Sequence, residues 1–107
     1  MLTLWSSVAV ADNYGAIAYS QGTGRYGYAG DYGSRAAAER EALDGCGDRT
    51  CAVVLWFRNA CGALATGNDG YGTGWAYSRR AAVGIAMSNC NKYTSRCSLL
   101  RWQCATR

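Results

Sequence analysis

Residues 34–57 read SRAAAEREALDGCGDRTCAVVLWF, a stretch that predicts a short helix, a turn between two cysteines and a buried strand. Ser34 is a good N-cap, because its hydroxyl can accept a hydrogen bond from a free amide of the first helical turn. Small apolar side chains recur on one face of the helix expected over residues 35–44, which favours close approach to a sheet. The continuous apolar run over 52–57 is typical of a central strand.

The same pattern returns in residues 78–104, SRRAAVGIAMSNCNKYTSRCSLLRWQC. Aligning the two stretches places Ser34-Arg35 on Ser78-Arg79 and Trp56 on Trp102, and the cysteines match as well. The upstream Gly27-Tyr28 falls on Gly74-Trp75. A repeat of roughly 45 residues indicates a duplicated supersecondary unit.

Each copy has the order strand, strand, helix, strand. The strands are expected over 14–19, 25–29 and 52–57, then 62–66, 70–77 and 98–103, with the second helix over 79–88. The predicted fold class is α+β: two tandem ββαβ pseudo-repeats that form one mainly antiparallel sheet of about six strands, with two packed helices and disulfide staples. Residues 14–107 are expected to form one domain, with repeat one at 14–60 and repeat two at 61–107.

Six cysteines in 107 residues are typical of a small exported protein held by disulfides. The repeat places a cysteine pair at each joint between helix and strand, which predicts the disulfides Cys46–Cys51 and Cys90–Cys97. Cys61 and Cys104 then form the third pair across antiparallel neighbours. The alternative is a zinc site made of the four joint cysteines, but their spacing is loose and the chain has no His.

Residues 1–13, MLTLWSSVAVADN, are interpreted as the remnant of an export signal, because Ala9-Val10-Ala11 has the small-x-small form of a cleavage site. The alternative is a genuine first strand. No apolar stretch is long enough to span a membrane.

The net charge of +4 is unevenly distributed, since residues 70–107 contain six bases and no acid. Arg beside rigid aromatic rings is typical of a binding surface. We therefore predict partner contacts, with an anionic protein as the partner, from residues of the second repeat: Tyr71, Trp75, Tyr77, Arg79, Arg80, Arg96 and Arg101. The alternatives are a solvated basic face and rings that only cover a small core. The sequence leaves the oligomeric state open.

The absence of His removes the usual general base and a common metal ligand. No catalytic residue, metal or cofactor is assigned. A glycosidase pair made of Asp31 and Asp69 is the enzymatic alternative. Nucleic acid is disfavoured as a partner, because the bases form no recognisable module and the cysteines indicate an oxidising compartment.

Taken together, GAIAY, SRAAAEREALDGC, CAVVLWFRNACGALA and LLRWQC resemble a bacterial family of secreted proteins, domain of unknown function 4189 (DUF4189), over nearly all of residues 14–104. The resemblance implies export, paired cysteines and a small α/β domain, and it brings no catalytic residues. We therefore expect a secreted or periplasmic, non-catalytic binding domain, either an inhibitor or immunity protein or a factor that meets a host or competitor. A small carboxylate-dependent hydrolase is the alternative function, and a purely structural envelope protein is a third.

Overall fold

The computed structural model describes residues 12–106 and contains two copies of the predicted ββαβ unit. The first copy consists of β1 (Tyr14–Tyr19), β2 (Tyr26–Tyr32), α1 (Arg35–Cys46) and β3 (Ala52–Arg58). The second consists of β4 (Cys61–Thr66), β5 (Tyr71–Ala76), α2 (Arg79–Tyr93) and β6 (Ser98–Cys104). The α+β class and the repeated element order are therefore confirmed.

The six strands do not form the single sheet that we expected. They form two antiparallel three-stranded sheets, a first sheet in the order β2-β1-β3 and a second sheet in the order β5-β4-β6. In each copy the third strand pairs with the first strand of the same copy, and within residues 12–106 no ladder joins the copies. One six-stranded sheet with both helices on one side would leave its other apolar face in water, whereas two stacked sheets cover that face.

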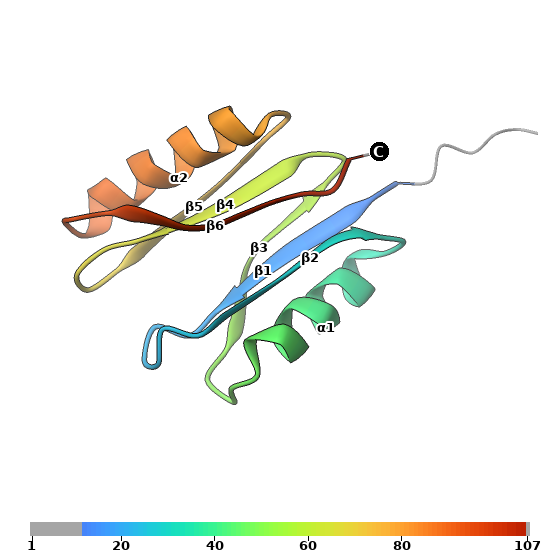
Figure 1. Ribbon diagram of the computed structural model, residues 1–107, viewed down its shortest axis with the longest axis horizontal. Coiled ribbons are helices and arrows are strands. Elements are labelled where there is room, and N and C mark those ends of the chain that lie inside the picture. Colours follow the sequence, from blue (N-terminus) through green and yellow to red (C-terminus); the bar gives the residue numbers. More distant parts are fainter. Residues whose placement is uncertain (1–11, 107) are drawn as a thin grey trace, which may run out of the picture.

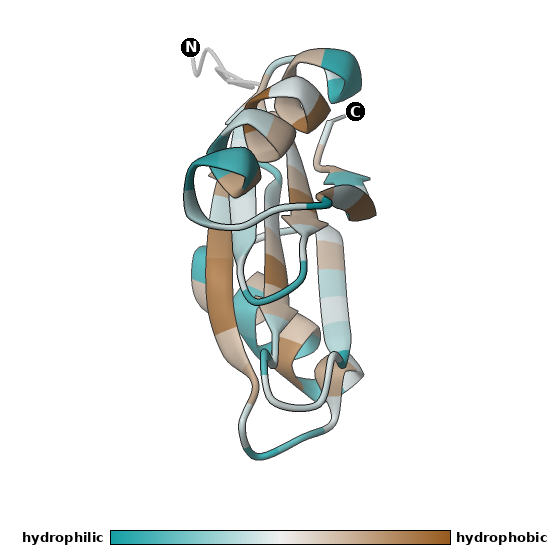
Figure 2. Cartoon of the chain, turned by 90° about the vertical axis from the view of Figure 1, so that its left-hand side faces the viewer, coloured by the Kyte–Doolittle hydropathy of each residue, from teal (hydrophilic) through white to brown (hydrophobic). Residues whose placement is uncertain are grey.

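The result is four layers, with α1 below the first sheet and α2 above the second sheet (Figure 1). Alternate residues of β1 and β4 point to opposite faces of their sheets, so one set packs against a helix and the other set packs between the two sheets. Ala16 and Ala18 of β1 pack against α1, and Ala63 and Ala65 of β4 pack against α2. In Figure 2 the strongest apolar colour lies on parts of the strands and of the helices, while the strongest hydrophilic colour lies mainly on loops and helix turns.

Between the sheets, Ile17 and Leu64 are fully buried and Phe57 is almost so. The Phe57 ring lies between two glycines from equivalent places in the two copies. A Cβ atom on Gly15 would lie 2.2 Å from the ring, and one on Gly62 would lie 2.5 Å from it. The absent side chains therefore let one ring join both sheets.

The helices begin where the sequence predicts. The Ser34 and Ser78 hydroxyls accept hydrogen bonds from the backbone N–H groups of Ala37 and Ala81 at 3.1 and 3.2 Å. The second helix runs to Tyr93, beyond the expected end at residue 88, and stops where the Thr94 N–H donates to the carbonyl of Cys90.

The structure contains the three disulfides that the repeat predicts, Cys46–Cys51, Cys61–Cys104 and Cys90–Cys97. The first and third join each helix to the strand that follows it, and the second joins directly opposite residues of β4 and β6. All six sulfurs are used in these bonds, so the zinc alternative is wrong. The export-signal prediction covers residues 1–13, of which residues 1–11 lie outside the described residues.

Candidate functional site

The main candidate site is an open groove on the side of the molecule where β3 and β5 lie next to each other. Both are edge strands, β3 of the first sheet and β5 of the second. The groove has a volume of about 580 Å³ and is lined by residues 54–58 of β3 together with Trp75 and Tyr77. Its lining is apolar and aromatic except for Arg58. We call it the β3–β5 groove.

Two exposed rings form one wall of the β3–β5 groove. Trp75 is 49% exposed and Tyr77 is 78% exposed. The rings contact each other edge to face, with centroids 5.7 Å apart. The glycines of β5 explain their position, because Gly72 and Gly74 face α2, so that Trp75 points to the opposite side. Amphipathic rings held rigidly at a surface are the usual anchors of protein interfaces.

On the other side of the molecule, the ring equivalent to Trp75 is that of Tyr28, which the protein itself covers in part and leaves 43% exposed. There the guanidinium carbon of Arg101, in β6, lies 3.6 Å from the ring centroid of Tyr28, in β2. The same side chain donates to the Gln103 amide oxygen at 3.0 Å. In the alignment of the two repeats, Arg101 corresponds to Leu55 and Tyr28 corresponds to Trp75. One side of the molecule therefore has an Arg beside a Tyr, where the other side has a Leu beside a Trp. Arg101, predicted to contact a partner, is thus engaged inside the protein.

A further pair of equivalent contacts joins each helix to the third strand of its copy. The guanidinium carbon of Arg35 lies 4.4 Å from the ring centroid of Trp56, and that of Arg79 lies 4.8 Å from Trp102. Arg79 and Arg80 line a shallow pocket with Trp102 beside α2. The repetition of this contact indicates a structural role, the covering of an edge-strand Trp by an Arg stem and guanidinium.

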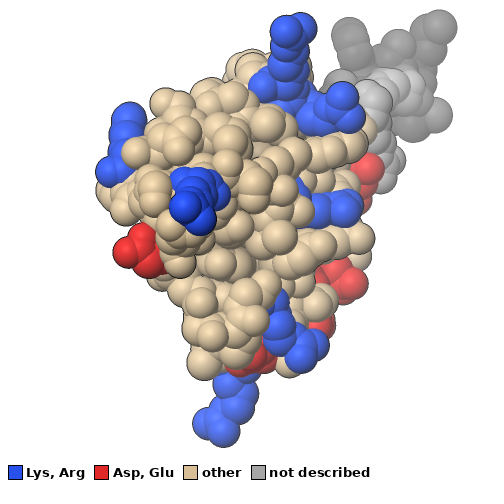
Figure 3. Space-filling view, turned by 60° about the vertical axis from the view of Figure 1, so that its left-hand side comes forward, with Lys and Arg blue, Asp and Glu red and all other residues tan. Residues whose placement is uncertain are grey.

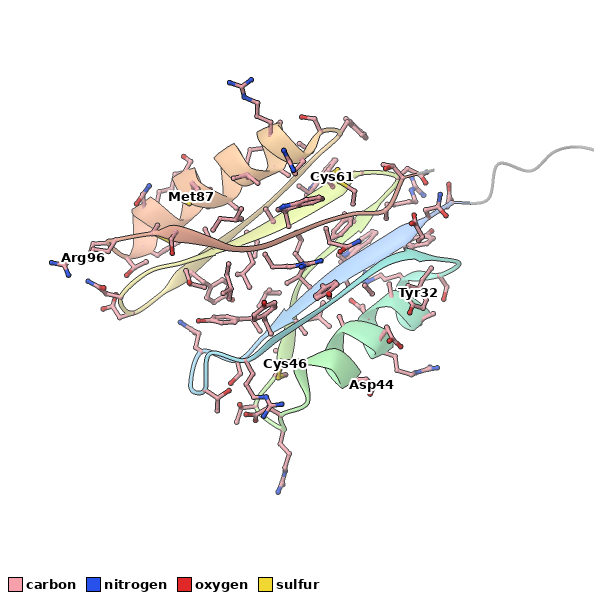
Figure 4. All side chains as sticks on the ribbon, viewed as in Figure 1. Tyr32, Asp44, Cys46, Cys61, Met87 and Arg96 are labelled. Carbon is pink, nitrogen blue, oxygen red and sulfur yellow. A yellow bond between two sulfur atoms is a disulfide. The ribbon has the colours of Figure 1, made fainter. Side chains whose placement is uncertain are left out.

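Two of the other predicted contact residues lie away from the groove. Tyr71 pairs with Thr66, at the end of β4 opposite to the Cys61–Ala76 pair that precedes Tyr77. Its ring packs edge to face on Tyr19 at 5.5 Å. Arg96 lies in the loop between α2 and β6, at the same far end (Figure 4).

The seven predicted residues are therefore divided among several surfaces. Trp75 and Tyr77 share the β3–β5 groove, Arg79 and Arg80 lie beside α2, and Tyr71, Arg96 and Arg101 lie apart from both pairs. Figure 3 shows that on the face in view the Lys and Arg side chains are scattered among uncharged residues. The basic residues of the second repeat thus do not form one continuous cationic face.

The structure does not bring together the carboxylates of the hydrolase alternative. Asp31 precedes Tyr32, which pairs with Tyr14 at the start of β1. Asp69 shares a shallow groove with Gln21, beyond the end of β1. A strand rises about 3.4 Å per residue, so the six residues of β1, at whose opposite ends the two Asp residues lie, span about 17 Å. Glycosidase pairs lie about 5–10 Å apart.

Within residues 12–106 there is also no group of three or more Cys, Asp or Glu side chains placed to hold a metal ion. Nor does the described part of the chain contain a helix with the length and apolarity needed to cross a membrane.

Sequence reasoning missed the β3 side of the groove, Leu55, Trp56 and Arg58. The run over 52–57 was expected to be a central strand, but β3 is an edge strand with Trp56 exposed. The apolar run does indicate cover on both faces, since Leu55 and Phe57 meet the second sheet and Trp56 meets Arg35. It carries no information about a missing neighbour in the plane of the sheet.

Comparisons with known proteins agree with this architecture. The sequence model of a family described as "Domain of unknown function (DUF4189)" matches residues 14–104. Protein Rv1269c of Mycobacterium tuberculosis is 45% identical over 78 residues, which is 73% of this chain and 61% of that protein. Uncharacterized protein Rv1813c of the same organism is 46% identical over 76 residues, 71% of this chain and 52% of that protein.

The NMR structure of Rv1813c from Mycobacterium tuberculosis superimposes with a TM-score of 0.66 at 36% sequence identity, over 86% of this chain and 74% of that one. The chain spans 52 to 61% of the length of these curated relatives.

Proposed function

Because the chain belongs to the family of domain of unknown function 4189, whose description names no activity, we propose from the geometry that it is a non-catalytic protein-binding domain that works outside the cytoplasm. Three disulfides are consistent with an extracytoplasmic protein, since such bonds persist in oxidising compartments. Secretion or periplasmic residence is part of the proposal.

The observation that supports binding is the open β3–β5 groove with its exposed Trp75 and Tyr77. A small domain gains stability by covering such rings, and the other side of this molecule does so by laying Arg101 on Tyr28. Among the described residues, no Arg or Lys lies over the ring of Trp75 or Tyr77. Exposed aromatic rings beside apolar side chains are typical of the centre of a protein interface. Arg58, at the end of the groove, favours an anionic partner.

A domain of this kind would act as an inhibitor or immunity protein, or as a secreted factor that contacts a host or competitor protein. The carboxylate-dependent hydrolase lacks comparable support, because Asp31 and Asp69 lie at opposite ends of β1. Fewer basic side chains would contact the partner than the sequence suggested. The proposed groove contains Arg58 and none of the basic residues of the second repeat.

The proposal is tested by affinity capture. The oxidised domain is immobilised and exposed to culture medium and to periplasmic extract of the source bacterium, and captured proteins are identified by mass spectrometry. The test variant is Trp75→Ala/Tyr77→Ala. The control is Tyr93→Ala, because Tyr93 is 75% exposed, close to the 78% of Tyr77, but lies at the far end of α2.

We expect a protein that is retained by the wild type and by the Tyr93 variant and lost with the double variant. Isothermal titration with the purified partner should then show at least about a tenfold loss of affinity, the effect of removing one interface anchor. Equal retention by all three proteins, or retention by none, would contradict the proposal.

A further inference from the structure

The strand β3 has the sequence of a central strand in the position of an edge strand. Residues 52–57, AVVLWF, contain no charge and no Pro, and Arg58 is the only charged residue of the strand. Its one hydrogen-bonded neighbour in the described chain is β1. Edge strands of soluble proteins are usually blunted by charges, Pro, Gly or bulges, because their free N–H and C=O groups otherwise pair with another chain.

The other three edge strands are blunted in these ways. In β2 the register shifts and Asp31 has a positive φ of 62°, which marks a bulge. In β5 glycines alternate with larger residues. Strand β6 has a register shift at Leu100 like the one in β3, but it carries Arg101 and Gln103 on its inner face, where β3 has only apolar side chains. In β3 the register shifts at Val54, which leaves residues 55–58 as a regular free edge. This free edge is the one that borders Trp75 and Tyr77.

A strand laid along residues 55–58 would have alternate side chains on two sides. One set would meet the rings of Trp75 and Tyr77, and the other set would lie on the side of Trp56. The end of the groove is cationic. Arg58 has one described ion pair, with Asp12 at 3.8 Å, in which the two side chains are 58% and 44% exposed. Such an exposed pair is weak, so a partner carboxylate can replace it.

We propose that the β3–β5 groove binds an extended segment of another protein by strand addition, in which the segment pairs with residues 55–58 and places an Asp or Glu on Arg58. This rests on the proposed function, because it names how the partner enters the same groove. Main-chain hydrogen bonds to the edge supply affinity, and the rings of Trp75 and Tyr77 select an apolar side chain. A second copy of this chain fits less well, since its groove lining offers Arg58 no acid.

The probe is a phage library of random linear 12-residue peptides, selected on the oxidised full chain. We expect enriched peptides with alternating apolar residues and an Asp or Glu. The affinity of a synthetic enriched peptide should fall at least about tenfold with Trp75→Ala and with Arg58→Glu. It should stay within about twofold with the matched controls Tyr93→Ala and Arg96→Glu, which change the same kinds of residue at the far end.

N-methylation of the peptide distinguishes strand addition from other modes. In a paired strand every second N–H points to the neighbouring strand, so methyl groups on one alternating set of amides should lower affinity at least about tenfold. Methyl groups on the other set should leave it nearly unchanged. Equal effects of both sets would overturn strand addition, while dependence on Trp75 in the affinity capture would still support the proposed function.

Three other results would also overturn the proposal. They are a library that yields no enriched peptide, peptides that bind the Trp75→Ala protein as well as the wild type, and a dimer in light scattering that Trp75→Ala converts to monomer. The last result would assign the groove to a second copy of the chain.

Discussion

Replacement of Gly15 by Ala should destabilise the protein by forcing the two sheets apart. A Cβ atom at this position would lie 2.2 and 2.4 Å from two carbons of the Phe57 ring and 2.9 Å from the backbone oxygen of Ala29. The ring cannot retreat, because its other edge faces Gly62 equally closely. Phe57 is 2% exposed, so no solvent-filled space is available to it.

The magnitude follows from the overpacking of a close-packed core, which costs about 1–3 kcal/mol. Because a backbone oxygen obstructs the second direction, we expect the upper part of that range, about 2–3 kcal/mol. At about 4 °C per kcal/mol for a domain of this size, Tm should fall by roughly 8–12 °C. The assay is urea unfolding of the oxidised protein, followed by Trp fluorescence, together with a thermal scan.

The control is Gly22→Ala, since a Cβ atom there would have nothing within 4 Å. Its free energy of unfolding should stay within about 0.5 kcal/mol of the wild type. The double variant Gly15→Ala/Phe57→Leu should be more stable than the sum of its single changes by at least about 0.5 kcal/mol, because the smaller side chain makes room for the methyl group. A Gly15→Ala protein as stable as Gly22→Ala, or strict additivity, would refute the reasoning.

Three further predictions concern the disulfides, one cation–π contact and one carboxyl group. Replacing both Cys61 and Cys104 by Ser should cost about 4 kcal/mol in the free energy of unfolding, against about 2 for either local disulfide, because the closed loop spans 43 residues; urea titrations of the variants check this. Arg101→Leu should leave stability within about 1 kcal/mol by the same assay, since it removes a cation–π contact together with a buried Nε that has no described partner. The N–H and hydroxyl of Thr50 hold the pKa of Asp48 below its ordinary value of 3.8, so the resulting stabilisation should be complete above pH 3.8 and disappear as the pH falls through the lower folded value. An NMR titration of the carboxyl group checks the direction, and Asp48→Asn should remove this pH dependence.

The elements and their internal bonds follow closely from local patterns. A helix face of Ala, an N-cap Ser and a cysteine pair between each helix and the next strand are short-range signals. Each of them occurs in both repeats. The pairing of Cys61 with Cys104 could be predicted because the repeat accounts for the other four cysteines as two local pairs. Such features depend on neighbours within one repeat.

The relation between the repeats could not be predicted in the same way. Hydropathy shows that both faces of residues 52–57 are covered, but it does not distinguish a neighbour in the same sheet from a second sheet stacked above. The candidate site could not be predicted fully either, because closeness in sequence does not show which residues share a surface. Tyr71 and Trp75 lie on the same side of β5 but near its opposite ends, and the turn into α2 takes Arg79 away from Tyr77.

Amide hydrogen exchange tests the central claim, that the free edge of β3 is where a partner binds. Exchange would be measured residue by residue in the free oxidised protein and with the captured partner or the enriched peptide. We predict that amides of residues 55–58 gain protection on binding, together with those around Trp75 and Tyr77. Protection confined to the surface of Arg79 and Trp102, or to residues 67–71, with residues 55–58 unchanged, would contradict the claim.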